Sequence, residues 1–113
     1  MRANLTVTGA PRSLLPEAEA TLLRVAQEAL ANVRKHAHAS QVELTLSYIG
    51  DTLILDVQDD GVGLDARSPA DELSGFGLHS MRERLARLGG SLAIESAPGE
   101  GLTLAVTLPT AQA

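Results

Sequence analysis

The sequence predicts an α+β fold, a two-layer α/β sandwich in which helices cover one face of a mixed, mostly antiparallel sheet. Stretches in which apolar and polar residues alternate with period two indicate strands, and two stretches with apolar residues at helical spacing indicate helices. Their order along the chain is strand, helix, two strands, helix, two strands. Two helices are too few to cover both faces of such a sheet, so both are expected on the same face.

Composition limits the chain to one domain and argues against several functions. The 113 residues suffice for one domain and not for two, and 44% of them are hydrophobic, so residues 1–113 are expected to bury one core. The absence of cysteine excludes disulfides and thiolate metal sites. A net charge of −5, with one Phe, one Tyr and no Trp, argues against nucleic-acid binding, which needs basic and stacking side chains.

The chain carries no sign of membrane insertion or export. No stretch approaches the roughly 18 consecutive apolar residues that span a bilayer, and no signal peptide precedes the first strand. We therefore expect a cytoplasmic location, with a membrane anchor left open for a longer parent chain.

The N-terminal third is expected to hold one strand and one long helix. Leu5 and Val7 alternate with threonines, which is typical of a short strand. After a turn-rich connector, Pro16 suits the first turn of a helix because its missing N–H costs nothing there. No further Pro or Gly occurs up to about residue 38, so residues 16–38 are expected to form a single helix.

The remainder is expected to hold two pairs of strands and a second, shorter helix. The turn at Gly50 lies between two alternating stretches, which predicts an antiparallel hairpin with one apolar face. The expected segments are strands over 41–48 and 53–59, a Gly-rich loop over 61–77, a helix over 78–88, and strands over 92–96 and 102–108.

The long helix has an apolar side and a polar stripe. The apolar residues that share one side are Leu23, Ala26, Leu30, Val33 and Ala37. On the opposite side lie Glu28, Asn32 and Lys35, with His36 at the margin. A solvated face explains Glu28 and Lys35 but explains Asn32 poorly, because Asn has weak helix propensity and competes for backbone hydrogen bonds. From the helix alone, a solvated face and a binding stripe are equally open.

A carboxylate is expected on the apolar face of the second hairpin strand. Leu55, Val57 and Asp59 share that face by alternation, and a carboxylate there must find a hydrogen-bond donor. Two interpretations are open: either the strand has ended and Asp59 caps a turn, or Asp59 is a buried acceptor at a pocket mouth for a ligand donor such as an exocyclic amino group. Gly61 and Gly63 follow directly and permit a sharp turn.

A second pair of glycines opens the shorter helix. Gly75 and Gly77 precede Leu78, where glycines permit close approach of backbone to a ligand and a helix N-terminus offers free N–H groups to an anion. Alone, such a pair is most simply an ordinary junction. It is not a Walker P-loop, because no Gly-Lys-Ser/Thr follows, and no βαβ unit surrounds it.

Taken together, these motifs resemble the GHKL (Bergerat-fold) ATPase family over about residues 19–109. Within it they are most similar to the ATP-binding catalytic domain of sensor histidine kinases of the nitrate-sensor and membrane-fluidity-sensor subgroup. Residues 28–37 resemble the N box of that subgroup, residues 59–63 the G1 box, and residues 75–84 the G2 box and the helix after it.

The resemblance implies a site for ATP and Mg²⁺. Asn32 would coordinate the Mg²⁺ ion, and Glu28 would act as a base or polar positioner. Lys35 and His36 would lie along the phosphates, and Asp59 would accept a hydrogen bond from the adenine amino group. The other implied nucleotide-binding positions are Gly61, Gly63, Gly75, Gly77, Leu78 and Thr103.

The last hairpin departs from the family pattern at Leu102 and Thr103. The family usually has Thr directly after the glycine of the last hairpin, where it supports adenine binding. Here Gly101 is followed by Leu102 and only then by Thr103. We expect either that Thr103 takes over through a small register change or that the polar contact is lost.

The resemblance also implies that the phosphoacceptor lies elsewhere. In this subgroup an acidic residue directly follows the acceptor histidine, whereas Ala or Ser follows each histidine here, namely His36, His38 and His79. We therefore expect an isolated, monomeric catalytic domain that transfers the γ-phosphoryl group of ATP to a histidine on a separate dimerisation domain of the parent kinase. A response regulator would act downstream, and no nucleic acid would take part.

Three alternative functions are open. A serine-protein kinase of the anti-sigma-factor type would share the pocket, although the Arg82-Glu83-Arg84 helix favours the sensor kinase. A non-catalytic nucleotide-binding module gains support from Leu102. A structural domain without a ligand requires every polar motif to be coincidence.

Overall fold

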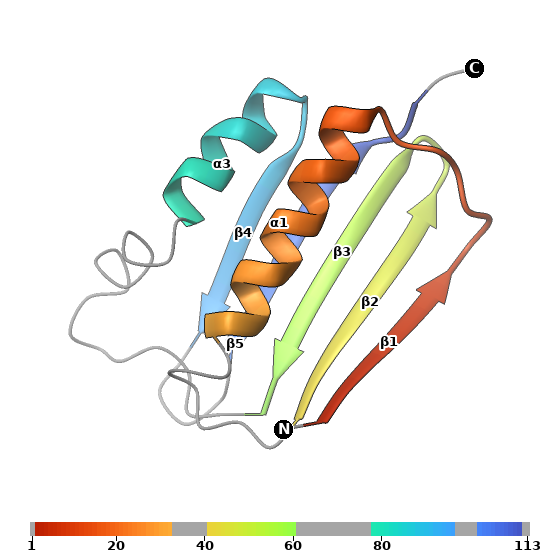
Figure 1. The fold of residues 1–113 in the computed structure, drawn as a ribbon. Coiled ribbons are helices and arrows are strands. Elements are labelled where there is room, and N and C mark those ends of the chain that lie inside the picture. Colours follow the sequence, from red (N-terminus) through yellow and green to blue (C-terminus); the bar gives the residue numbers. More distant parts are fainter. Residues whose placement is uncertain (1, 33–40, 61–77, 97–101, 112–113) are drawn as a thin grey trace.

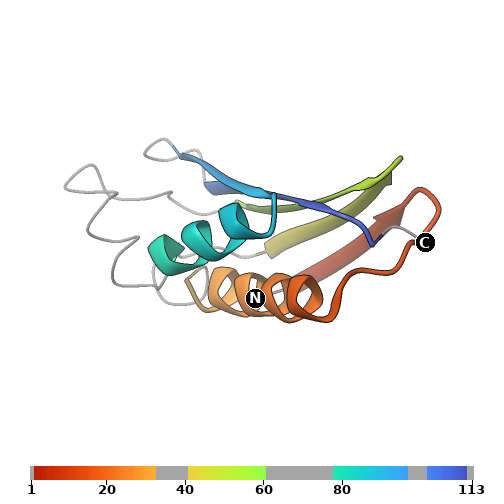
Figure 2. The ribbon, with the colours of Figure 1, turned by 90° about the horizontal axis from the view of Figure 1, so that it is seen from above.

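The computed structural model describes residues 2–32, 41–60, 78–96 and 102–111, which form a five-stranded sheet with two helices on one face (Figures 1 and 2). The elements are β1 (Arg2–Thr8), α1 (Pro16–Asn32), β2 (Gln41–Ile49), β3 (Thr52–Asp59), α3 (Leu78–Arg87), β4 (Ser91–Ser96) and β5 (Leu102–Pro109). The predicted α+β sandwich is therefore confirmed, as are its strands to within a few residues.

The sheet is mixed and mostly antiparallel, as predicted. Its strand order is β1-β2-β3-β5-β4. Only β1 and β2 run parallel, and the other three pairs are antiparallel. The last strand in the sequence thus lies inside the sheet, between β3 and β4.

The hairpin of β2 and β3 turns at Gly50, which has a φ of 58°. Residues that carry a side chain rarely adopt that left-handed backbone conformation, so glycine suits the turn. The hairpin pairs Leu46 with Leu55 and Leu44 with Val57, so apolar side chains from both strands share the helix-covered face.

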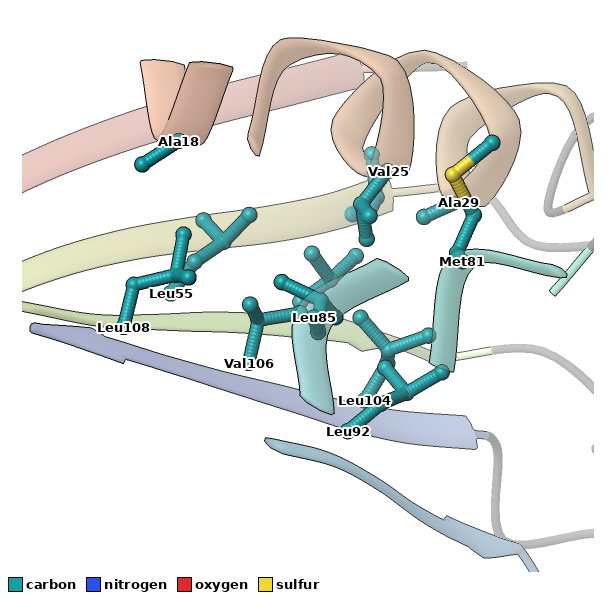
Figure 3. Packing of buried hydrophobic residues seen from close by; sticks show 12 residues of the cluster. Ala18, Val25, Ala29, Leu55, Met81, Leu85, Leu92, Leu104, Val106 and Leu108 are labelled. Atoms are coloured by element: carbon teal, nitrogen blue, oxygen red, sulfur yellow. The ribbon is translucent and has the colours of Figure 1, made fainter. Parts of the chain in front are cut away.

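The core lies between the two helices and strands β3 and β5. Val57 of β3 and Leu104 and Val106 of β5 are fully buried. Above them lie Val25 of α1 and Leu85 of α3, and Figure 3 shows that these side chains point toward the sheet. Burial of each such side chain stabilises the fold by about 1.5–3 kcal/mol relative to exposure.

The predicted apolar side of α1 is wrong at Leu23, which is 60% exposed. The residues of α1 that are buried instead are Ala18, Thr21, Val25 and Ala29. Ala26 and Leu30 of the predicted side do pack against the core, so the prediction is right for these two residues. Val33, Ala37 and the expected helical extension to residue 38 lie outside the described residues.

At one end of the sheet, three segments far apart in the sequence are joined through Asp51. Its carboxylate Oδ1 lies 2.7 Å from Nη1 of Arg12, and its carbonyl oxygen accepts a hydrogen bond of 2.8 Å from the amide of Thr110. The amide of Ala111 donates to the carbonyl of Ser13 at 2.8 Å. The connector before α1, the β2–β3 turn and the C-terminal segment are therefore fastened together.

None of the described helices is long and apolar enough to cross a bilayer.

Candidate functional site

Asp59 is the last residue of β3 and is buried, with 5% of its surface exposed. It pairs with Val42 of β2 and shares the helix-covered face with Val57. Among the described residues it is the one buried side chain that carries a charge. The strand has therefore not ended before Asp59, as the first of the two interpretations required. The burial expected for an acceptor facing a pocket is observed.

The side chain of Asp60 caps this strand end, a role that was not predicted from the sequence. The amide of Gln41 donates to Oδ1 of Asp60 at 3.0 Å, and the amide of Asp60 donates to the carbonyl of Gln41 at 3.3 Å. A signal was available, because Asp readily accepts hydrogen bonds from nearby backbone amides beside glycine turns. That signal did not reveal the partner, because Gln41 lies 19 residues away in the sequence.

Glu28 lies in the last turns of α1, beside the helix face that packs on the sheet. It directly precedes the buried Ala29 and follows the buried Val25 by three residues. Its side chain is 30% exposed, and its Oε1 lies 3.7 Å from Nε of Arg24. Glu28 therefore flanks the packed face, whereas the predicted stripe lay on the side of the helix opposite to the apolar residues. A surface ion pair of this spacing contributes only about 0.3–0.5 kcal/mol, so it leaves the carboxylate available.

Asn32 is the last residue of α1, one turn beyond Glu28. Figure 1 shows that α1 ends, β3 ends and α3 begins toward the same end of the molecule. The end of α1 with Asn32 and the end of β3 with Asp59 thus lie on the same side of the fold, with Leu78 at the start of α3.

Several predicted site residues lie outside the described part of the chain: Lys35, His36, Gly61, Gly63, Gly75 and Gly77. Residues 33–40 follow α1, and residues 61–77 connect β3 to α3. Both segments therefore connect to β2 or β3 at the end of the sheet where Asp59 lies.

Thr103 does not join Asp59. It pairs with Gln58 of β3 and Glu95 of β4, and its neighbour Leu104 is fully buried on the helix-covered face. Because successive side chains of a strand point to opposite faces, Thr103 lies on the face without helices. In this register Thr103 and Asp59 lie on opposite faces of the sheet, which does not favour an adenine contact of Thr103, and its assignment to the nucleotide site stays a prediction.

Residues 17–112 match the family model described as "Histidine kinase-, DNA gyrase B-, and HSP90-like ATPase". The chain belongs to this family. The resemblance to GHKL ATPases predicted from the three motifs is thereby confirmed at the level of the family. Within the described residues of this ATPase domain, no group of three or more His, Asp or Glu side chains is placed to hold a metal ion.

Its curated relatives include sensor kinases that are several times longer. The signal transduction histidine-protein kinase/phosphatase UhpB of Salmonella typhimurium is 45% identical over 89 residues, which cover 79% of this chain and 17% of UhpB. DegS of Bacillus subtilis, with the same description, is 33% identical over 97 residues, which cover 85% of this chain and 25% of DegS. The ATPase domain therefore spans about a quarter or less of these relatives.

Solved structures share the fold. The histidine kinase domain of a blue-light activated histidine kinase of Erythrobacter litoralis superposes with a TM-score of 0.80 at 21% identity, covering 96% of this chain and 51% of that one. The histidine kinase AdeS of Acinetobacter baumannii gives a TM-score of 0.77 at 16% identity, covering 98% and 55%. The arrangement of sheet and helices is thus that of histidine kinase domains.

Proposed function

We propose that this chain binds Mg-ATP and serves as the catalytic domain of a two-component sensor histidine kinase. The buried carboxylate of Asp59 at the end of β3 carries the proposal. Desolvation of a carboxylate is costly, and a donor such as the adenine amino group offsets that cost. A guanine base presents a carbonyl oxygen at the same place, so Asp59 would favour adenine over guanine.

The phosphate end of the site is assigned to α1 and the segments beside it. Asn32 would supply an amide oxygen to Mg²⁺, which usually takes one or two protein oxygens and completes its shell with phosphate oxygens and water. Such a site needs no cluster of carboxylates. The ion would offset the phosphate charge when bound. Lys35 and His36 would lie along the phosphates, while backbone at Gly61, Gly63, Gly75, Gly77 and Leu78 would pack around the nucleotide.

Glu28 is proposed to act at the acceptor. In the transfer, the bond between the γ-phosphorus and the β,γ-bridging oxygen breaks, a phosphorus–nitrogen bond to an imidazole forms, and ADP leaves. The partly exposed carboxylate of Glu28 would accept the proton that the imidazole loses or orient the ring. The acceptor histidine would belong to a dimerisation domain, and a response regulator would receive the phosphoryl group.

We further place the chain, as a single cytoplasmic domain, in the nitrate-sensor and membrane-fluidity-sensor subgroup. The similarity to UhpB and DegS, both histidine-protein kinase/phosphatases, supports a histidine kinase, and their greater length agrees with acceptor and sensor domains elsewhere in a parent protein. The isolated domain is expected to be monomeric.

Isothermal titration calorimetry with ATP and ADP, with and without Mg²⁺, tests the proposal on the wild type, Asp59→Asn and Asn32→Ala. We expect Asp59→Asn to abolish binding of both nucleotides and Asn32→Ala to remove the dependence on Mg²⁺. Failure of the folded wild type to bind nucleotide at millimolar concentration would refute the proposal. Binding without transfer to any purified dimerisation domain would favour the non-catalytic module.

A further inference from the structure

We propose that Asp60 is a positioning residue that fixes Asp59 for adenine recognition by capping the first amide of β2. This inference rests on the proposed function, because its consequence is a change in nucleotide preference. Asp60 itself is exposed and would touch no part of the nucleotide.

The contacts of Gln41 carry the argument. Both of its backbone groups bond to Asp60: the carbonyl accepts from the Asp60 amide at 3.3 Å, and the amide donates to the Asp60 side chain at 3.0 Å. In a regular antiparallel pair the second bond would go to the carbonyl of Asp60. The side chain of Asp60 therefore takes the place of its own backbone carbonyl.

Because the side chain of Asp60 replaces its carbonyl as the acceptor, the chain can leave the sheet directly after Asp60 while the last pair of residues stays hydrogen-bonded. The ladder between β2 and β3 ends at the pair of Val42 and Asp59. Terminal pairs of a ladder open most readily. The two bonds between Asp60 and Gln41 lie one position beyond Asp59, so fraying begins at Asp60 and not at the residue that would contact adenine.

A fixed strand end matters here because of what Asp59 is. Burial of a carboxylate costs free energy of desolvation, so a strand end that frays would expose the side chain of Asp59 to water. A hydrogen-bond acceptor discriminates between ligands only when its position is held by its surroundings. Asp60 supplies that support from outside the site.

The same cap fastens the return of the chain from α1. Gln41 is the first residue of β2 and follows the segment 33–40, which carries Lys35 and His36. The side chain of Asp60 thus connects the end of β3, which carries the proposed adenine acceptor, to the residue that follows the proposed phosphate-binding segment.

Three variants separate positioning from general stability. Asp60→Ala removes the cap, and Asp60→Asn keeps an oxygen that can accept from Gln41. Asp56→Ala is the matched control, because it removes the same charge from β3 on the face away from Asp59. Thermal unfolding monitored by circular dichroism verifies that each variant is folded.

The decisive quantity is the ratio of ATP affinity to GTP affinity, measured by calorimetry. We expect Asp60→Ala to weaken ATP binding by up to about fivefold while GTP binding changes less, so that the ratio of ATP affinity to GTP affinity falls. The loss of the cap can pass on to binding no more than the worth of its own hydrogen bond, which corresponds to about that factor. Asp60→Asn and Asp56→Ala are expected to keep the wild-type ratio. A merely destabilised protein would lose both affinities by the same factor, and that result would overturn the proposal.

Hydrogen exchange of the Gln41 amide, followed by NMR without nucleotide, tests the cap apart from the proposed function. We expect faster exchange in Asp60→Ala and unchanged exchange in Asp56→Ala, and unchanged exchange in both would overturn the cap. A wild type that binds neither nucleotide overturns the proposed function and the positioning role with it. A wild type that prefers ATP, beside an Asp60→Ala variant with the same preference, overturns the positioning role alone.

Discussion

Asp59 and Val42 face each other across the β2–β3 ladder, and both side chains are buried, with 5% and 0% of their surfaces exposed. A charged residue thus occupies a position that its neighbours would fill with a hydrocarbon side chain. Local rules of folding are commonly broken in this way where a site requires it.

Replacement of that carboxylate should separate stability from binding. We expect Asp59→Leu to leave the free energy of unfolding unchanged or to raise it by about 1 kcal/mol, because burial of a charge is costly. The same variant should bind no ATP. Urea denaturation and calorimetry measure the two quantities. A loss of stability above about 2 kcal/mol would instead assign Asp59 a structural role.

The corrected face of α1 gives a matched pair of variants. Val25 is fully buried, so Val25→Ala should lower the free energy of unfolding by about 2 kcal/mol through lost burial and a cavity. Leu23 is 60% exposed, and Leu23→Ala should change stability by less than about 0.5 kcal/mol although it removes more atoms. Chemical denaturation of both variants checks the order, and the reverse order would restore the helix face predicted from the leucines.

Glu28→Gln should impair transfer and spare binding. The amide keeps the size of the side chain but accepts no proton, so phosphorylation of a histidine-bearing dimerisation domain should fall by about 10²–10⁴-fold. Affinity for Mg-ATP should stay within about twofold, since the change acts on the reaction step. Arg24→Ala, which removes only the ion pair of 3.7 Å, is the control and should keep most activity. Equal activity of Glu28→Gln and wild type would rule out a chemical role for Glu28.

Thr103→Val tests which face of the sheet binds nucleotide. Thr103 lies on the face without helices, so its hydroxyl group should contribute nothing and the affinity for ATP should remain within about twofold of wild type. The measurement is a calorimetric titration beside Asp59→Asn. A tenfold loss would mean that the register between β3 and β5 changes when nucleotide binds.

Thr110 offers a stabilising substitution far from the site. It is 5% exposed, and its hydroxyl oxygen has no hydrogen-bond partner among the described residues. Thr110→Val keeps the shape and removes the buried polar atom, so stability should rise by about 1 kcal/mol. Thr107→Val, at a half-buried position of β5, is the control and should change stability by less than about 0.5 kcal/mol. A lower melting temperature for Thr110→Val would show that the hydroxyl group is bonded in solution.

The strands could be predicted because their alternation is set by one buried face. Leu55 and Val57 alternate with polar neighbours, and the structure buries them as expected. The burial of Asp59 followed from the same pattern, since a period of two continues to the end of a strand. The face of α1 was predicted only in part, because Leu30 packs against the core but Leu23 is exposed.

The capping pair could not be read from the sequence for a different reason. The bond from Gln41 to Asp60 depends on how two strands pair, and pairing is a property of the whole sheet. Thr103 differs, because its face follows by alternation from the buried Leu104, and the sequence left open only whether a change of register alters that face.

The place of β5 has a consequence for biosynthesis. Of the described strands this one comes last in the sequence, yet it lies between β3 and β4 and supplies three fully buried residues, Leu104, Val106 and Leu108. Until these residues leave the exit tunnel of the ribosome, β4 lacks the strand with which it pairs, and the helices lack part of the sheet that they cover. The sheet is therefore complete only after residues 102–109 have been synthesised, and a chain that stops before them loses its core together with its edge strand.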